Sequence, residues 1–250
     1  MTSKLYQYNF PARTIYGKYS ARQIPDICKE LKLSPAFVVT DSGILQQKFF
    51  QEIIYNLQQA NIPSHIYSQN WGNPVKSQVE KGSLLYKQSH CDGIIAIGGG
   101  ASLDMAKAIA VLIHHDGDLF DYEDGKADAR PITNNIPPII TIPTTAGTGS
   151  EVGRSTVISD DNTKQKKIIF SPYLMAKTVI LDPITTVHLP QSITASTGMD
   201  ALTHLIESYL AIGFQPLCDA IAIHGIRLVN DYLVRCSEYS KNPDELNTAM

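Results

Sequence analysis

Closely spaced cysteines are missing from this chain, and their absence narrows the chemistry open to it. Its 250 residues contain four cysteines, Cys28, Cys91, Cys218 and Cys236, and no two of them form a C-x-x-C pair. A zinc knuckle and a redox dithiol both need that close spacing, so we expect neither. We expect instead reduced cysteines that serve as packing residues in a cytosolic protein.

The sequence also lacks a membrane segment and an excess of charge of one sign. Residues 1–8 (MTSKLYQY) have no apolar stretch like that of a signal peptide, and no apolar run approaches the ~20 residues that span a bilayer. The formal net charge is −3, and no basic stripe could follow a phosphate backbone. We therefore expect a soluble cytoplasmic protein that has neither nucleic acid nor a membrane as a partner.

What the chain does contain is an alternation of two kinds of apolar pattern over roughly its first 180 residues. Continuous apolar runs, typical of strands buried on both faces of a sheet, occupy residues 37–40, 93–97, 139–142 and 178–181. Apolar residues at helical spacing lie between them, at residues 45–59, 75–86 and 102–113. Strands that alternate with helices predict an α/β fold with a parallel, Rossmann-like sheet.

The pattern changes near residue 189, after which no strand candidate remains. Residues 194–212 and 217–234 carry apolar residues at helical spacing, and Gly213 and Pro216 separate the two segments. We predict an α/β domain at residues 1–188, followed by the start of an all-α domain at residues 189–250. Residues 242–245 (NPDE) resemble a helix start. Little sequence follows them, so we expect a truncated all-α domain rather than a short terminal helix.

A glycine-rich segment, residues 98–107 (GGGASLDMAK), follows one predicted strand and opens a predicted helix. Consecutive glycines allow close approach of a ligand, and the free amides of a helix start attract an anion, so the segment is typical of a phosphate cradle. It is neither a Walker A loop nor G-x-G-x-x-G. A tight turn that binds nothing is the alternative interpretation.

A second polar loop, residues 143–151 (PTTAGTGSE), follows another predicted strand and offers three threonine hydroxyls. Two such loops at the carboxyl edge of one sheet favour a shared dinucleotide site. Asp41 ends a third strand, where its carboxylate could accept hydrogen bonds from a ribose and would repel a 2′-phosphate. The spacing fits equally well a turn or capping aspartate ahead of Gly43.

Asp200 and His204 lie four residues apart in a predicted helix, so both side chains project from one face. A carboxylate and an imidazole together suit a divalent cation such as Fe²⁺ or Zn²⁺. Taken alone, the pair is more often a surface pair or cap than a metal site. His224 in the next predicted helix could face the pair, but the sequence does not show whether it does.

In combination, these motifs resemble the iron-containing, or group III, alcohol dehydrogenases. Asp41, the glycine-rich segment, the threonine loop and residues 198–207 (GMDALTHLIE) occur in the order of that family, and Asn73, Lys166 and residues 181–183 (LDP) fit it too. The resemblance covers nearly the whole chain. It implies hydride transfer between a primary or secondary alcohol and NAD, with NADP less favoured because of Asp41.

The resemblance also implies that the protein acts on a small alcohol or aldehyde and forms homo-oligomers. It further implies a set of site residues. A cation, Fe²⁺ or alternatively Zn²⁺, would polarise the alcohol oxygen as a Lewis acid, with no catalytic residue apart from the metal ligands. The implied metal ligands are Asp200 and His204. The implied cofactor contacts are Asp41, Asn73, Gly98, Gly99, Gly100, Ser102, Asp104, Thr144, Thr145, Thr148 and Lys166.

Two departures from the family pattern keep other functions open. Ala101 stands where the family usually has serine, and the family's two further metal-binding histidines would lie beyond residue 250. A catalytic metal normally has at least three protein ligands. The alternatives are therefore a truncated or non-catalytic homologue that binds NAD without turnover, or a relative of the glycerol dehydrogenases and dehydroquinate synthases.

Overall fold

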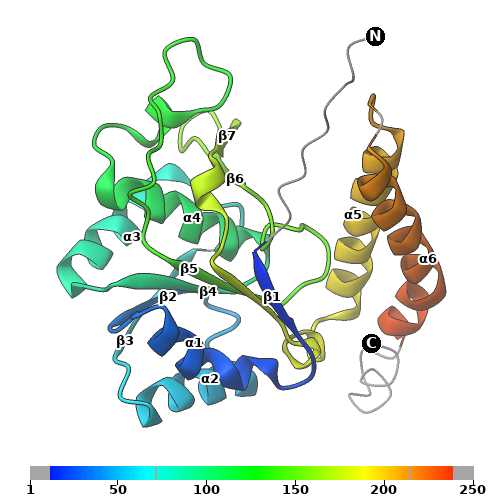
Figure 1. The fold of residues 1–250 in the computed structure, drawn as a ribbon, viewed down its shortest axis with the longest axis horizontal. Helices are drawn as coiled ribbons and strands as arrows, with labels where there is room; N and C mark the ends of the chain where they lie inside the picture. Colours follow the sequence, from blue (N-terminus) through cyan, green and yellow to red (C-terminus); the bar gives the residue numbers. More distant parts are fainter. Residues whose placement is uncertain (1–11, 71, 214, 239–250) are drawn as a thin grey trace.

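A six-stranded parallel sheet forms the centre of the larger part of the molecule, in a computed structural model that describes residues 12–70, 72–213 and 215–238 (Figure 1). The strand order is β1-β8-β5-β4-β2-β3, and every neighbouring pair is parallel. The predicted parallel α/β fold is therefore confirmed. The strands are β1 (Arg13–Tyr16), β2 (Ala36–Asp41), β3 (Ser64–Asn70), β4 (Gly93–Gly98), β5 (Ile139–Pro143) and β8 (Thr178–Leu181).

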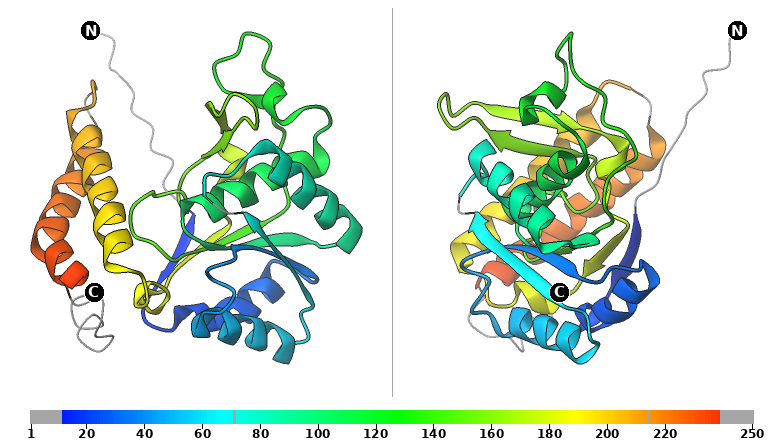
Figure 2. Two further views of the ribbon diagram at one scale, coloured as in Figure 1. Left: turned by 180° about the vertical axis from the view of Figure 1, so that it is seen from behind. Right: turned by 90° about the vertical axis from the view of Figure 1, so that its left-hand side faces the viewer.

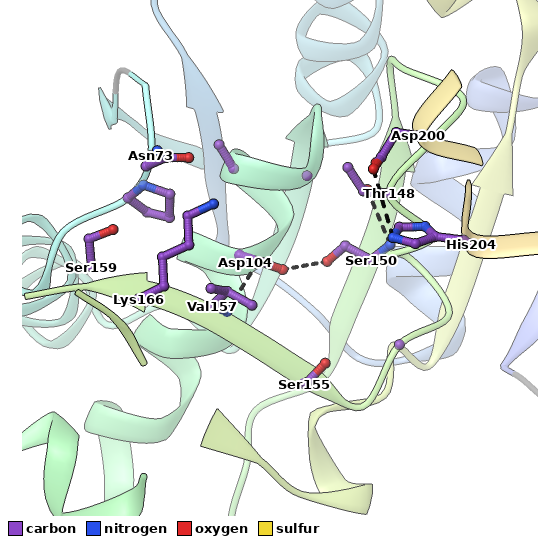
Figure 3. A pocket seen from close by; sticks show the side chains of 15 residues that line it. Asn73, Asp104, Thr148, Ser150, Ser155, Val157, Ser159, Lys166, Asp200 and His204 are labelled. Atoms are coloured by element: carbon purple, nitrogen blue, oxygen red, sulfur yellow. Dashed lines mark hydrogen bonds and ion pairs between the residues drawn. The ribbon is translucent and has the colours of Figure 1, made fainter. Parts of the chain in front are cut away.

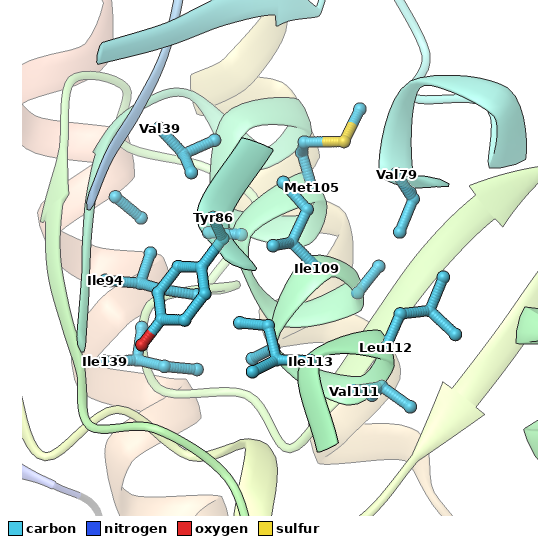
Figure 4. Packing of buried hydrophobic residues seen from close by; sticks show 14 of the residues in the cluster. Val39, Val79, Tyr86, Ile94, Met105, Ile109, Val111, Leu112, Ile113 and Ile139 are labelled. Atoms are coloured by element: carbon cyan, nitrogen blue, oxygen red, sulfur yellow. The ribbon is translucent and has the colours of Figure 1, made fainter. Parts of the chain in front are cut away.

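Helices cover both faces of this sheet, which is why its central strands are mostly apolar. Side chains alternate between the faces: Ile94 of β4 joins one apolar cluster and Ile95 joins the other. The first cluster includes residues of α3 (Lys76–Ser89) and α4 (Gly100–His114), as Figure 4 shows, and the second includes residues of α1 (Ile24–Glu30) and α2 (Lys48–Gln59). The core of the α/β part therefore lies in two layers, one on each side of the sheet.

An antiparallel hairpin lies beside α4 and was not predicted from the sequence. It consists of β6 (Ser155–Ser159) and β7 (Lys166–Phe170), and β6 packs against α4. Short 3-10 helices complete this part: η1 (Ser20–Gln23), η2 (Leu119–Tyr122), η3 (Pro172–Leu174) and η4 (Pro183–Thr186).

Two long helices, α5 (Gln191–Leu210) and α6 (Pro216–Glu238), stand beside the carboxyl edge of the sheet (Figures 1 and 2). They run antiparallel and approach closely at two glycines. A Cβ added to Gly198 would lie 2.1 Å from Leu233, and one added to Gly225 would lie 2.6 Å from Leu205. The helices predicted at residues 194–212 and 217–234 are thus present, and each begins slightly earlier than expected.

The described helices include none that is both long and apolar enough to cross a membrane. The expected helix start at residues 242–245 lies outside the described residues. The helix predicted from residue 45 begins instead at Lys48, because the amides of Gly43 and Ile44 donate to the Asp41 carboxylate and hold residues 41–44 in a turn.

Candidate functional site

A cavity of about 420 Å³ opens between the carboxyl edge of the sheet, the β6–β7 hairpin and α5 (Figure 3). Parallel strands present their following loops at this edge, where α/β proteins commonly bind ligands. The lining residues come from segments far apart in the sequence: Asn73, Pro74, Gly100, Ala101, Asp104, Thr148, Gly149, Ser150, Gly153, Ser155, Val157, Ser159, Lys166, Asp200 and His204.

The glycine-rich segment forms the turn from β4 into α4 at one wall of this cavity. Gly98 has a φ of +152°, a backbone conformation that favours glycine, and a Cβ there would lie 2.5 Å from the Ser102 hydroxyl. The N-cap of α4 is Gly99, so no side chain caps the helix start, and its first turn holds no acidic residue. The amides at this helix start therefore retain their attraction for an anion.

The threonine loop after β5 lies directly against the start of α4. Gly98 pairs with Pro143 in the sheet, and the Thr144 amide donates to the Gly98 carbonyl at 3.0 Å. A Cβ on Gly100 would lie 2.6 Å from the methyl carbon of Thr148. The two loops that the sequence predicted to share a site are thus in contact, and Thr148 reaches the cavity.

The same loop also contacts the base of α5. A Cβ on Gly147 would lie 2.5 Å from the carbonyl oxygen of Thr197, so only glycine permits this approach of two backbones. Asp200 follows Thr197 in α5 by about one turn. The contact therefore fixes where the Asp200 and His204 pair stands relative to the loop.

Asp200 and His204 face the cavity from α5, with 3.8 Å between the Asp200 Oδ1 and His204 Nε2 atoms (Figure 3). Both side chains remain about half exposed, at 46% and 50%, which leaves their oxygen and nitrogen atoms accessible to a ligand. Among the described residues, no group of three or more His, Cys, Asp or Glu side chains could hold a metal ion. His224 on α6 is exposed and is not among the lining residues. The metal role of the pair stays a prediction.

Asp41 makes the turn that the sequence left as one of two interpretations. Its Oδ1 accepts from the amides of Gly43 (3.0 Å) and Ile44 (3.1 Å), and its Oδ2 accepts from the Ser102 hydroxyl at 3.3 Å. The carboxylate thus adjoins the glycine turn, although it does not line the cavity itself. The other predicted cofactor residues outside the lining, at this same edge of the sheet, are Gly98, Gly99, Ser102, Thr144 and Thr145.

Asn73 and Lys166 lie at the end of the cavity away from α5 (Figure 3). The hairpin holds this end together, because the Ser159 amide donates to the Pro74 carbonyl at 2.8 Å. The Asp161 carboxylate accepts from both the amide and the hydroxyl of Ser77 at the start of α3. These contacts bring the segment before α3 next to the end of β6 and the turn of the hairpin, although the segments are far apart in the sequence.

A buried polar network, which the sequence analysis did not identify, joins α4 to the threonine loop. The side chain of Lys107 is fully buried, and its Nζ donates to the carbonyls of Ser150, Gly153 and Ser155. Burial lowers the pKa of Lys107 from its ordinary 10.5 to about 8. The signal that could have revealed it is a single lysine within an otherwise apolar helical segment at residues 105–113.

Asp104 belongs to the same network and also lines the cavity. Its Oδ1 accepts from the Ser150 hydroxyl at 2.6 Å, and its Oδ2 accepts from the Val157 amide at 3.1 Å. Burial raises the pKa of Asp104, and it raises that of Glu151 as well. The carboxylate of Asp104 therefore joins α4, the loop and β6.

The β6 residues of the cavity wall, Ser155, Val157 and Ser159, were not predicted as site residues. They belong to a hairpin strand whose polar and apolar residues give no continuous run, so only its position in three dimensions brings them to the cavity.

Comparison with known families gives two matches along the chain. The family described as iron-containing alcohol dehydrogenase matches residues 11–183, and the family described as Fe-containing alcohol dehydrogenase, C-terminal, matches residues 194–250. The two matches divide the chain close to the connection between β8 and α5.

Individual relatives agree with the family matches. Choline dehydrogenase of Bacillus subtilis is 39% identical over 93% of this chain and 58% of its own length. Among solved structures, a 1,3-propanediol oxidoreductase has a TM-score of 0.90 at 31% identity, covering 98% of this chain and 63% of its own. A sulfoacetaldehyde reductase of Bifidobacterium kashiwanohense, in complex with NAD+, has a TM-score of 0.90 at 30% identity, covering 99% and 64%. The chain thus spans less than two thirds of the length of these relatives.

Proposed function

We propose, because the chain belongs to the iron-containing alcohol dehydrogenase family, that its function is hydride transfer between a small primary or secondary alcohol and NAD. The observation that carries the proposal is one cavity that joins the uncapped start of α4 to Asp200 and His204 on α5. An anionic cofactor and a cation-assisted alcohol would then meet within a single space.

For the cofactor, the start of α4 offers the pyrophosphate a helix end without a side-chain cap, and glycines 98–100 allow its close approach. Thr144, Thr145 and Thr148 would line the nicotinamide side, and Asn73 and Lys166 would be further cofactor contacts. Asp41 would accept hydrogen bonds from the adenosine ribose, which favours NAD over NADP. A relative solved in complex with NAD+ supports this choice.

For the metal, Asp200 and His204 offer one carboxylate and one imidazole on the cavity side of α5, a donor set that suits Fe²⁺ or Zn²⁺. The chemistry that such a cation supplies is Lewis-acid polarisation of the alcohol oxygen. The two side chains would hold it against the loop that Gly147 fixes to α5. The protein would contribute position and exclusion of water rather than a general base.

We further propose a boundary between an α/β dinucleotide domain and a helical metal domain near residue 188, between η4 and α5. We propose a cytoplasmic homo-oligomer as its setting.

The proposal can be tested by titrating the protein with NAD and with Fe²⁺, and by following NADH formation at 340 nm over a panel of small alcohols. We expect stoichiometric NAD binding and alcohol-dependent NADH formation with metal present. The Asp200→Asn/His204→Gln double variant should keep NAD affinity and lose metal binding, because neither residue is among the predicted cofactor contacts. A protein that bound no NAD would refute the assignment. NAD binding without metal or turnover would favour the truncated or non-catalytic homologue instead.

A further inference from the structure

The ammonium of Lys107 lies in a pocket of backbone oxygens, one layer behind the cavity wall. Its Nζ donates to the Gly153 and Ser155 carbonyls at 3.0 Å each, and to the Ser150 carbonyl and hydroxyl. Hydrogen bonds from a charged donor are stronger than those between neutral groups. A lysine side chain is rarely fully buried unless its charged group is paired. A single side chain from α4 thus collects acceptors from the end of the threonine loop and the start of β6.

The charged groups that face this ammonium are Asp104 on α4 itself and Glu151 on the loop. Both carboxylates favour the protonated form of Lys107 and so oppose the lowering of its pKa by burial. Asp104 is also connected to it through a relay, because the Ser150 hydroxyl accepts from Lys107 and donates to the Asp104 carboxylate at 2.6 Å. The lysine therefore offsets acidic charge beside a cavity that would receive an anionic cofactor.

The residues that this network holds include part of the cavity wall. Ser150, Gly153 and Ser155 accept from Lys107 and line the cavity, and Gly149 and Thr148 precede them in the same loop. Thr148 in turn packs on Gly100 at the start of α4. The loop that carries Thr148 is thus joined to α4 by a lysine that does not itself line the cavity.

We propose that Lys107 is a positioning residue for the dinucleotide site, which fixes residues 150–155 on α4 by donating to the carbonyls of Ser150, Gly153 and Ser155. Its effect on the loop follows from the contacts alone. Its effect on cofactor affinity rests on the proposed function.

The test compares Lys107→Met, which keeps the apolar stem and removes the donors, with Lys81→Met, a matched change at an exposed lysine of α3. Amide hydrogen exchange of the ligand-free protein reads the loop directly. We expect exchange in residues 148–157 to rise roughly tenfold or more in Lys107→Met, as buried carbonyls lose a charged donor, with the strands β4 and β5 unchanged. Lys81→Met should exchange like the parent protein. Unchanged exchange in the loop of Lys107→Met would overturn the proposal.

A second readout separates positioning from a general loss of structure. Lys107→Ala leaves a space lined by the same carbonyls, which methylammonium could enter as a small cation with N–H donors. We expect loop protection, and with it NAD affinity, to recover with methylammonium and not with sodium or tetramethylammonium at equal ionic strength. Failure of methylammonium to restore loop protection in a variant that is otherwise folded would count against the proposal.

NAD titrations of the same variants keep the two proposals distinguishable. If the parent protein binds NAD, we expect the dissociation constant for NAD to be about tenfold larger in Lys107→Met and unchanged in Lys81→Met. If the parent protein binds no NAD while the loop still loosens in Lys107→Met, the positioning role stands and the proposed function fails. If the parent protein binds NAD and Lys107→Met binds it with the same affinity, Lys107 does not position the dinucleotide site and the proposal is wrong.

Discussion

Helix α4 and the helix pair α5–α6 illustrate two different ways in which a helix can be stabilised. Every residue of α4 from Ser102 to Ile113 except Asp104 is buried, because the helix lies between the sheet and the hairpin. In contrast, α5 is 20 residues long and buries only Gly198, and α6 is 23 residues long and buries only Ala222. Most helical stability comes from packing rather than propensity. We therefore expect α4 to share the stability of the core, whereas α5 and α6 depend mainly on each other.

The sharpest test of this comparison is one isoleucine in each region. Ile109 of α4 is fully buried, whereas Ile206 of α5 is 41% exposed. We expect Ile109→Ala to lower the free energy of unfolding by about 2–5 kcal/mol, because it leaves a cavity in a packed core. Ile206→Ala should change it by less than about 0.5 kcal/mol. Urea denaturation followed by circular dichroism measures both, and equal losses would contradict the contrast.

The second test acts on the contact between α5 and α6. A Cβ at residue 198 would lie 2.1 Å from the Leu233 side chain, so Gly198→Val should separate the helices at a cost of about 1–3 kcal/mol from overpacking. We expect amide exchange to increase in α5 and α6 and to stay unchanged in the sheet. Met199→Val, at an exposed neighbouring position on α5, serves as the control. Increased exchange throughout the sheet would show that the two regions unfold together.

The third test uses pH and the one lysine buried in α4. Because the folded-state pKa of Lys107 is lowered from 10.5 to about 8, the unfolded chain holds more protons between these values. Below about pH 8, the folded protein bears the full cost of burying the charged ammonium. The contribution of Lys107 to the free energy of unfolding therefore rises by about 1.4 kcal/mol per pH unit between pH 8 and 10.5. Asp104 and Glu151 are the charged groups that face it.

Subtracting the free energy of unfolding of the Lys107→Met variant at the same pH removes the contribution of other titrating groups. One such group is Tyr67, whose pKa burial raises to about 12. We expect the free energy of unfolding of the parent protein, relative to the variant, to increase from pH 8 to 10.5. A difference that stays flat in this range would mean that Lys107 is not buried as a cation.

Burial also explains which strands could be predicted from the sequence. Strands β4 and β5 are buried on both faces, so their continuous apolar runs were recognisable, and the turn after each followed from its glycines and threonines. Strands β1 and β3 lie at the sheet edges, where β1 is largely exposed, and their polar residues concealed them. Edge strands carry weaker patterns because fewer of their side chains are buried.

The parts of the candidate site that could be predicted were those marked by local motifs. Asp200 and His204 share a helical turn, so their common face followed from spacing, whereas the Lys107 network required knowing that residues 150–155 fold back over α4. The approach of Asn73 to Lys166 likewise depends on the docking of the hairpin. Contacts between distant segments have no local signature, which is why these were missed or known only through resemblance.

The smallest expected effect on stability concerns the outer surface of the helix pair. Apolar side chains such as Leu210 (71% exposed), Ile221 (54%) and Val234 (63%) remain in contact with water there. Exposed apolar area favours association at about 25 cal/mol per Å² buried, so we expect the chain to self-associate through α5 and α6. Ile221→Gln with Val234→Gln should change the free energy of unfolding by less than about 0.5 kcal/mol and lower the average mass in analytical ultracentrifugation. Leu84→Gln, at an exposed position of α3, should leave that mass unchanged, and an equal decrease there would mean that association does not depend on the helix pair.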